Sequence, residues 1–229
     1  MIVVAKARPS ERAQFIQKTY LHLAGAVGAF ILVEIMLFQL GIAEGLLNFI
    51  SAGGQWMWLG ILGGFALLGW FSRSLAAKAD DVNTQYAGLG LYVIAEALIF
   101  APLLYIAAYF SDPTVLPTAA ILTLLLFAGL TTVALTTRTD FTFLGGILKI
   151  GGFVALGLII CGTIFGFTLG LFFSVAMVIF ASAAILYDTS KIIHHYSTHQ
   201  HVAASLELFA SVALLFWYVL RIVMALSRR

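Results

Sequence analysis

The sequence predicts an all-α integral membrane protein, a bundle of seven transmembrane helices, from three observations. Of the 229 residues, 62% are apolar and only 10% are charged, whereas a soluble domain carries roughly 25% charged residues. The mean hydropathy is +1.06. Apolar runs of about 20 residues recur along nearly the whole chain, and each is long enough to cross ~30 Å of hydrocarbon as a helix. Residues 1–20 are predicted to form a charged cytoplasmic arm, and residues 21–229 a single transmembrane domain.

The spans follow one another with short connections that glycine, proline and polar residues mark. They are predicted at Leu21–Ile42, Trp56–Ser74, Gly88–Phe110, Val115–Thr136, Phe143–Thr163, Gly166–Tyr187 and Ser205–Leu226. "AEGLLN" and "SAGGQ" predict a turn after the first span. The fifth connection, within "CGTIFGFTLG", has glycines but no charge. A break is still expected there, because the apolar stretch around it is about twice the length that one helix needs.

Basic residues near the spans predict the orientation. The N-terminal arm and the second, fourth and sixth connections hold eight of them, and the other connections hold none; the eight are Lys6, Arg8, Arg12, Lys18, Arg73, Lys78, Arg138 and Lys191. This places the N-terminus in the cytoplasm. Arg228 and Arg229 would then emerge on the opposite side, so the alternative is that the last segments do not all cross. Seven crossings are favoured, since late charges seldom reverse a topology set by earlier helices.

Two acidic residues are predicted deep in the membrane. Glu34 lies about midway along the first span and Glu96 about midway along the third, with no basic residue within a helical turn of either. Placing an unpaired charge at that depth costs about 3 kcal/mol or more, so both side chains could be neutral at pH 7. They are interpreted either as hydrogen-bonding groups that hold helices together or as part of an ion or proton pathway.

Two further acids stand at the predicted junction of the last two spans. Asp188 closes the sixth span, with Lys191 three residues on as a possible partner, and Glu207 opens the seventh. The short connection puts Asp188 and Glu207 at similar depth on adjacent antiparallel helices. Two carboxylates brought together there cannot both ionise cheaply, so such a pair would act as a proton-sensitive latch. The alternative is two solvated acids at the membrane border.

Other chemistries find less support. Four histidines cluster around the sixth connection, namely His194, His195, His199 and His201. A metal site needs a defined geometry, and no Cys or Glu joins them in a recognised spacing, so a solvated loop is the favoured interpretation. The hydrolase patterns H-E-x-x-H and G-x-S-x-G are absent from the sequence, so neither an enzyme nor a cofactor is expected. A net charge of +2 without a basic stripe indicates no nucleic-acid partner.

Two segments resemble a known family. "LTTRTDFTFLGG" (Leu135–Gly146) enters the fifth span and "AILYDTSKIIH" (Ala184–His194) leaves the sixth. They are similar to the two signature segments of the Bax inhibitor-1 family, and "KTYLHLAGAVGAF" before the first span is similar as well. The resemblance covers essentially the whole chain and is to the bacterial YccA-like branch. It implies six helices around a central, C-terminal seventh, and an inner (plasma) membrane location.

The resemblance also implies candidate functions. Members of the family are associated with a calcium leak that pH modulates and with suppression of cell death in eukaryotes; the YccA-like branch is associated with restraining the membrane-anchored protease FtsH. In calcium-leak members two aspartates on the last two helices form the pH-sensing pair. The first matches Asp188, and the second falls at Ser211. Glu207 lies one turn before Ser211 on the same face, from which it could replace the missing aspartate. Arg73 is a candidate counter-ion for Asp188, or an arginine that snorkels to the interface.

Two functional hypotheses follow. In the first, the protein is a calcium-leak pathway in which Asp188 and Glu207 gate or ligate calcium, whose preferred ligands are oxygens, and Glu34 and Glu96 line the path. In the second, it is an interaction protein that binds FtsH through its charged N-terminal arm, where Pro9 followed by Ser10 predicts a helix start capped by Ser10. The expected partners are the lipid bilayer, calcium or protons, and, in the second hypothesis, FtsH.

Overall fold

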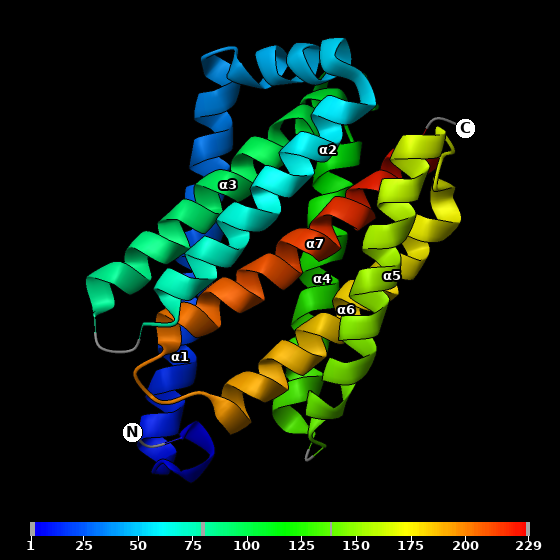
Figure 1. The fold of residues 1–229 in the computed structure, drawn as a ribbon. Helices are drawn as coiled ribbons and strands as arrows, with labels where there is room; N and C mark the ends of the chain where they lie inside the picture. Colours follow the sequence, from blue (N-terminus) through cyan, green and yellow to red (C-terminus); the bar gives the residue numbers. More distant parts are fainter. Residues whose placement is uncertain (1–2, 79–80, 138, 228–229) are drawn as a thin grey trace.

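The structure, a computed structural model, describes residues 3–78, 81–137 and 139–227 apart from the side chain of Gln55. Its helices, drawn in Figure 1, are η1 (Val4–Lys6), α1 (Pro9–Gln39), α2 (Ile42–Ala76), α3 (Val82–Tyr109), α4 (Val115–Thr136), η2 (Phe141–Phe143), α5 (Leu144–Phe165), α6 (Gly170–His195) and α7 (His201–Ser227). Arg138, Arg228 and Arg229, which were used to predict the orientation, lie outside the described residues.

The predicted seven-helix architecture is confirmed. Within the described ranges, seven helices are long and apolar enough to cross a membrane, and the two termini lie at opposite ends of the bundle (Figure 1). We call the end with the N-terminus and the α2–α3, α4–α5 and α6–α7 connections the N-terminal face, and the other end the C-terminal face. Large apolar side chains cover the outside of the bundle, among them Phe172 at 88% exposure and Phe153 at 77%, as expected where helices face lipid.

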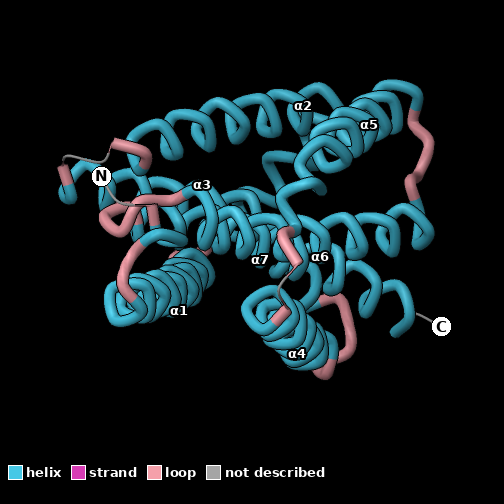
Figure 2. Tube along the Cα trace, turned by 90° about the horizontal axis from the view of Figure 1, so that it is seen from below, coloured by secondary structure: helices cyan, strands magenta, loops and turns pink. Residues whose placement is uncertain are grey.

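Helix α7 lies near the centre, as the resemblance implied. It packs against α1, α2, α3, α4 and α6, whereas α5 packs chiefly against α6 and α2. Figure 2 shows α3, α7 and α6 between α1 and α4 on one side and α2 and α5 on the other. Helices α3 and α7 are also the two most enclosed spans. Polar groups on these two helices are therefore shielded from lipid better than those on the outer helices.

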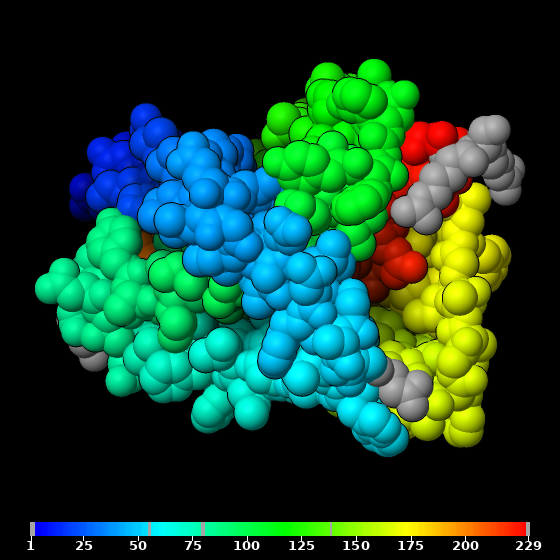
Figure 3. Space-filling model, turned by 90° about the horizontal axis from the view of Figure 1, so that it is seen from above, coloured from blue at the N-terminus to red at the C-terminus, as the bar shows by residue number. Residues whose placement is uncertain are grey.

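The first connection differs from the prediction. The residues expected to form a turn are helical, and α2 begins already at Ile42. Its first part lies across the C-terminal face (Figures 1 and 3). The chain then changes direction at Gly54, whose φ of 63° and ψ of −156° interrupt the helix before the span from Trp56 to Ala76. Glycine adopts this conformation without the steric penalty of a Cβ, so one residue suffices for the bend.

The fifth connection agrees with the prediction. Helix α5 ends at Phe165, and Gly166 follows with a φ of 72°; Gly170 opens α6 with a φ of 61°. These left-handed residues end one helix and start the next without a charged loop. The glycines of "CGTIFGFTLG" therefore mark a break between two spans.

The N-terminal arm is mostly helical and is attached to the bundle. Helix α1 begins at Pro9, and its cap residue is Arg8 rather than the predicted Ser10; the Arg8 backbone N–H donates to Glu11 Oε2 at 3.4 Å. Before it, the Val4 side chain is completely buried, and its backbone N–H donates to the Tyr196 carbonyl oxygen at 2.9 Å. The arm is thus fixed to the α6–α7 connection.

Candidate functional site

Asp188 is buried at the N-terminal face, between the last two helices. It is 8% exposed, and its Oδ2 accepts a hydrogen bond of 2.5 Å from the Ser211 hydroxyl, which is itself on a buried residue. Asp188 comes from the last turns of α6 and Ser211 from the middle of α7. The residue at which the family resemblance implies an aspartate is therefore in direct contact with Asp188, but as a neutral donor.

Glu207 has a different direct partner. Its Oε2 lies 3.4 Å from Nε of Arg73, near the end of α2, with the Glu207 side chain 25% exposed and that of Arg73 47% exposed. The Arg73 guanidinium also lies 5.6 Å from the centre of the Tyr92 ring on α3. This ion pair and the cation–π contact join α2, α3 and α7 at the N-terminal face.

The proposed direct carboxyl pair of Asp188 and Glu207 is not formed, and Arg73 is not the direct counter-ion of Asp188. Among the described residues, Asp188 bonds Ser211 and Glu207 bonds Arg73. The physical reason is that the Glu207 side chain finds a guanidinium on α2, whereas Ser211 is the α7 residue that contacts Asp188. The two acids are nevertheless near enough for their charges to interact. Both also act on Tyr196 in the α6–α7 connection, where burial first, and then the charges of Glu207 and Asp188, raise the pKa of the hydroxyl.

Lys191 does not make the predicted ion pair with Asp188. Its ammonium group lies 5.6 Å from the centre of the Tyr187 ring and 5.8 Å from that of Tyr196. These aromatic faces attract the cation. Asp188 is therefore left with a neutral hydroxyl, rather than a cation, as its direct partner.

The two deep acids have different environments. Glu34 on α1 is 6% exposed, and neither carboxyl oxygen has a hydrogen-bond partner among the described residues. Glu96 on α3 is equally buried, but it lines a cavity of about 640 Å³ together with Arg73, Tyr92 and Ser211. Glu34 does not line this cavity, so the two acids do not share it, and their assignment to an ion or proton pathway stays a prediction.

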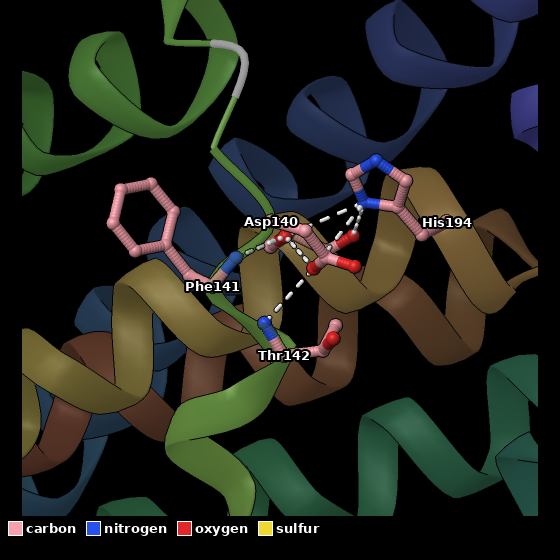
Figure 4. A network of polar contacts seen from close by, with 5 residues as sticks. Asp140, Phe141, Thr142 and His194 are labelled. Atoms are coloured by element: carbon pink, nitrogen blue, oxygen red, sulfur yellow. Dashed lines mark hydrogen bonds and ion pairs between the residues drawn. The ribbon is translucent and has the colours of Figure 1, made fainter.

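A second polar cluster connects the two motif segments (Figure 4). Asp140 Oδ1 accepts hydrogen bonds of 2.9 Å from the Thr142 backbone N–H and from the Ser190 hydroxyl. The Ser190 hydroxyl oxygen accepts a hydrogen bond of 3.0 Å from the Phe141 backbone N–H. His194 Nδ1 lies 3.8 Å from Asp140 Oδ1 and 2.8 Å from the Ser190 carbonyl oxygen. The α4–α5 connection is thereby fixed to the end of α6, next to Asp188.

Sequence reasoning missed this cluster. The cluster contains the residue types of a catalytic triad, in Asp140, Ser190 and His194. However, Ser190 is 1% exposed, and its hydroxyl is already hydrogen-bonded to Asp140 and to the Phe141 backbone N–H. The arrangement is therefore structural. The available signal was the position of Asp140 two residues before Thr142, which is typical of an aspartate that caps a helical turn.

The charge of Asp140 is expected to contribute to stability in a defined pH range. The Thr142 backbone N–H first, and then other donors, lower the pKa of Asp140 to about 2. A lowered pKa means that the carboxylate stabilises the fold above the unfolded-state value near ~4, and that this contribution is lost as the pH falls from about 4 toward 2. Asp140→Asn should lower the thermal stability in detergent by a constant amount at pH ~5 to 7. The difference from the parent protein should shrink below pH ~4, and a difference that persists unchanged at pH ~2.5 would contradict this origin.

The metal interpretation gains no support from the geometry. The described part of the chain contains no group of three or more His, Cys, Asp or Glu side chains placed to hold a metal ion. Among the clustered histidines, His194 contacts Asp140, while His201 packs edge-on against His22 at 4.8 Å between ring centres. Asp188 and Glu207, the candidate calcium ligands, direct their carboxyl oxygens at Ser211 and Arg73 respectively.

The fold and the site define a seven-helix membrane protein with a buried acid between its last two helices. The sequence model of the family described as "Inhibitor of apoptosis-promoting Bax1" matches residues 12–229, and the chain belongs to this Bax inhibitor-1 family. An uncharacterized protein of Pseudomonas aeruginosa is 39% identical over 48% of this chain and 49% of its own length. An uncharacterized protein of Neisseria meningitidis is 26% identical over 79% of both chains.

A viral relative is also similar. The "Golgi anti-apoptotic protein" of vaccinia virus is 30% identical over 57% of this chain and 54% of its own length. The matches to the Pseudomonas and vaccinia proteins thus span about half of those relatives. The family membership rests on the match over residues 12–229.

Proposed function

We propose that the protein is a pH-sensitive calcium-leak pathway of the bacterial inner membrane, closed at its cytoplasmic, N-terminal face by protonated Asp188. The observation that carries the proposal is the buried 2.5 Å hydrogen bond from Ser211 to Asp188. This bond holds α6 against α7 at the face where Arg73 and Glu207 join α2 to α7. One titratable group thus stands at the point where three helices meet.

The proton on Asp188 decides how these helices are held. With the proton in place, a neutral carboxyl group faces a neutral hydroxyl, and burial is tolerable. Without it, a charge stands in a buried position with no direct cationic partner, which costs free energy, and Glu207 repels it. The free-energy cost of the buried charge falls when water enters between α6 and α7 or when Arg73 moves from Glu207 toward Asp188. Either movement loosens the N-terminal face.

The position of Arg73 determines how strongly cations are repelled from the cavity. Arg73 lines one end of the cavity that also contains Glu96 and Ser211. A fixed guanidinium there repels a divalent cation, and the repulsion weakens when Arg73 turns to an ionised Asp188. The carboxylate of Glu96 then offers the type of oxygen ligand that calcium prefers. Calcium flux is therefore expected to rise with pH.

Calcium flux into proteoliposomes tests the proposal. In the parent protein we expect flux to increase between pH ~5 and 8, where a coupled carboxyl group can titrate. Asp188→Asn keeps an acceptor for Ser211 but cannot ionise, so its flux should stay low and independent of pH. Glu207→Gln removes the repelling charge and frees Arg73, so flux should begin to rise at lower pH. Unchanged pH dependence in both variants would refute the proposal.

Asp112→Asn is the matched control for these variants. Asp112 is an exposed aspartate at the opposite face of the bundle, and its Oδ1 accepts a hydrogen bond of 2.8 Å from the Thr114 backbone N–H. Its neutralisation should leave the pH profile of the flux unchanged. A similar flattening in this control would indicate a general effect of charge rather than a gate at Asp188.

Binding to a membrane-anchored protease such as FtsH is a second candidate, supported by the exposed basic side chains of the arm. Lys6, Arg8 and Lys18 are exposed at the N-terminal face. Deleting the arm would also remove the buried Val4 and so disturb the α6–α7 connection. The double substitution Lys6→Glu and Arg8→Glu is therefore the better variant. In the same flux assay it should match the parent protein, while protease binding should fall if the second candidate holds.

A further inference from the structure

The 640 Å³ cavity extends beyond the gate, between α2, α3, α5 and α7. Arg73 and Ser211 mark its end toward the N-terminal face. Its other end, toward the C-terminal face, is lined by Arg221 of α7 and by Thr168 of the α5–α6 connection. Ser211 and Arg221 are ten residues apart on one helix, which corresponds to about 15 Å along the axis. The cavity is therefore elongated along the membrane normal.

The end near Arg221 carries an uncompensated positive charge. Arg221 is partly buried and has no ion pair or hydrogen bond among the described residues. Thr168 is exposed, and its hydroxyl likewise has no partner in that part of the chain. Helix α6 begins next to it without a side-chain cap and without an acidic residue in its first turn, so its unpaired N–H groups add positive potential. A guanidinium and a hydroxyl that line the same cavity can both bind a phosphate group.

The rest of the cavity is lined mainly by apolar and aromatic side chains. Trp58, Leu62 and Phe65 approach from α2, and Leu214 and Trp217 approach from α7. Such a wall is mainly apolar, with the tryptophan N–H groups as its hydrogen-bond donors, and its shape and composition suit contact with an alkyl chain. The cavity thus combines an anion-binding end with a hydrocarbon-binding wall.

We propose that this cavity binds an anionic phospholipid, with its phosphate at Arg221 and Thr168 and one acyl chain along the wall of α2 and α7. Inorganic phosphate would satisfy Arg221 but leave the apolar wall unfilled. A zwitterionic lipid would fill the wall and also carries a phosphate, but its quaternary ammonium group brings a second positive charge to the end of the cavity that Arg221 already makes positive. Only an anionic phospholipid supplies both a negatively charged headgroup for Arg221 and an acyl chain for the apolar wall. Arg221 lies near the end of α7, at the depth where headgroups meet a transmembrane bundle.

Lipid binding to the purified full-length protein tests the proposal. The protein in neutral detergent is titrated with phosphatidylglycerol or with phosphatidylcholine, and bound lipid is counted by native mass spectrometry. We expect phosphatidylglycerol to bind more tightly. Arg221→Gln should weaken its binding about fivefold, the equivalent of the ~1 kcal/mol typical of one basic residue and an anionic lipid, and should weaken binding of phosphatidylcholine, whose headgroup has no net charge, by less.

Three comparisons separate this site from general surface charge. Arg221→Lys keeps the charge and should retain the preference for phosphatidylglycerol, which excludes misfolding as the cause of a loss. Lys149→Gln removes an exposed cation of α5 that does not line the cavity, and should change nothing. Leu62→Trp narrows the cavity along its apolar wall and should weaken the binding of both lipids.

Several results would overturn the proposal. They are equal binding of the two lipids by the parent protein, an equal loss in Lys149→Gln and Arg221→Gln, or unchanged lipid binding in Leu62→Trp. Thermal stabilisation by inorganic phosphate as large as that by phosphatidylglycerol would identify a phosphate site without a lipid chain. None of these outcomes depends on calcium flux, so the gate at Asp188 and the lipid site can fail separately.

Discussion

Gly88→Ala is expected to force α2 and α3 apart and to destabilise the bundle by about 1–3 kcal/mol, the range for overpacking a close contact. A Cβ at position 88 would lie 2.6 Å from the Ser72 carbonyl oxygen and 2.7 Å from the Ala76 backbone nitrogen. Both atoms belong to the helix backbone of α2, which cannot move aside as a flexible side chain can. Helices α2 and α3 form the most extensive helix pair in the bundle, so a shift there affects Arg73 at the end of α2 as well.

Gly90→Ala is the matched control for this substitution. Gly90 lies on the same helix, two residues on, and a Cβ there would meet nothing within 4 Å. Alanine is favoured over glycine within a helix by up to about 1 kcal/mol, so this variant should be as stable as the parent protein or more so. Thermal unfolding in detergent measures both. Equal stability of Gly88→Ala and Gly90→Ala would show that the close approach of α2 and α3 is not required.

The sequence predicted the bundle because membrane insertion leaves a strong signal. Each span must be long and apolar, and even the uncharged fifth break was evident from the length of the surrounding stretch. The first connection was predicted wrongly because glycines and polar residues are typical of turns, and the same residues occur in a helix that lies across the end of a bundle. Only the backbone conformation of Gly54 distinguishes the two cases.

Within the candidate site, the sequence predicted which residues lie near one another but not which of them pair. Asp188, Glu207, Ser211 and Arg73 all lie at or near the N-terminal face where α6 and α7 meet, as predicted. Which carboxylate receives the guanidinium depends on the distance of α2 from α7, and sequence spacing within one helix says nothing about that distance. The expected pair of Asp188 with Lys191 failed for the same reason, because two tyrosine rings compete for the ammonium group.

The cluster of Asp140, Ser190 and His194 joins the two distant segments that carry the family resemblance. One segment supplies the capping aspartate and the other supplies the serine and histidine that bind it. Because Ser190 follows Asp188 by two residues, this cluster also fixes the end of α6 on which the buried acid stands. Under the proposed gate, a change in the charge of Asp188 is therefore expected to act against a helix end that is held in place, with α7 or Arg73 as the partner that moves.

Ser211→Asp is expected to make the stability of the α6–α7 junction strongly dependent on pH. The new carboxyl group would stand where the Ser211 hydroxyl now lies, 2.5 Å from Asp188 Oδ2. At pH ~5 the two groups can share a proton, and stability should be close to that of the parent protein. As the pH rises toward ~8 the proton is lost, and two buried like charges should cost roughly 3 kcal/mol, measured by thermal unfolding across this range. Ser211→Asn has nearly the same shape without the charge and should show no such slope. If both variants lose stability equally with pH, the junction tolerates a second charge, and Asp188 cannot act as a latch through repulsion.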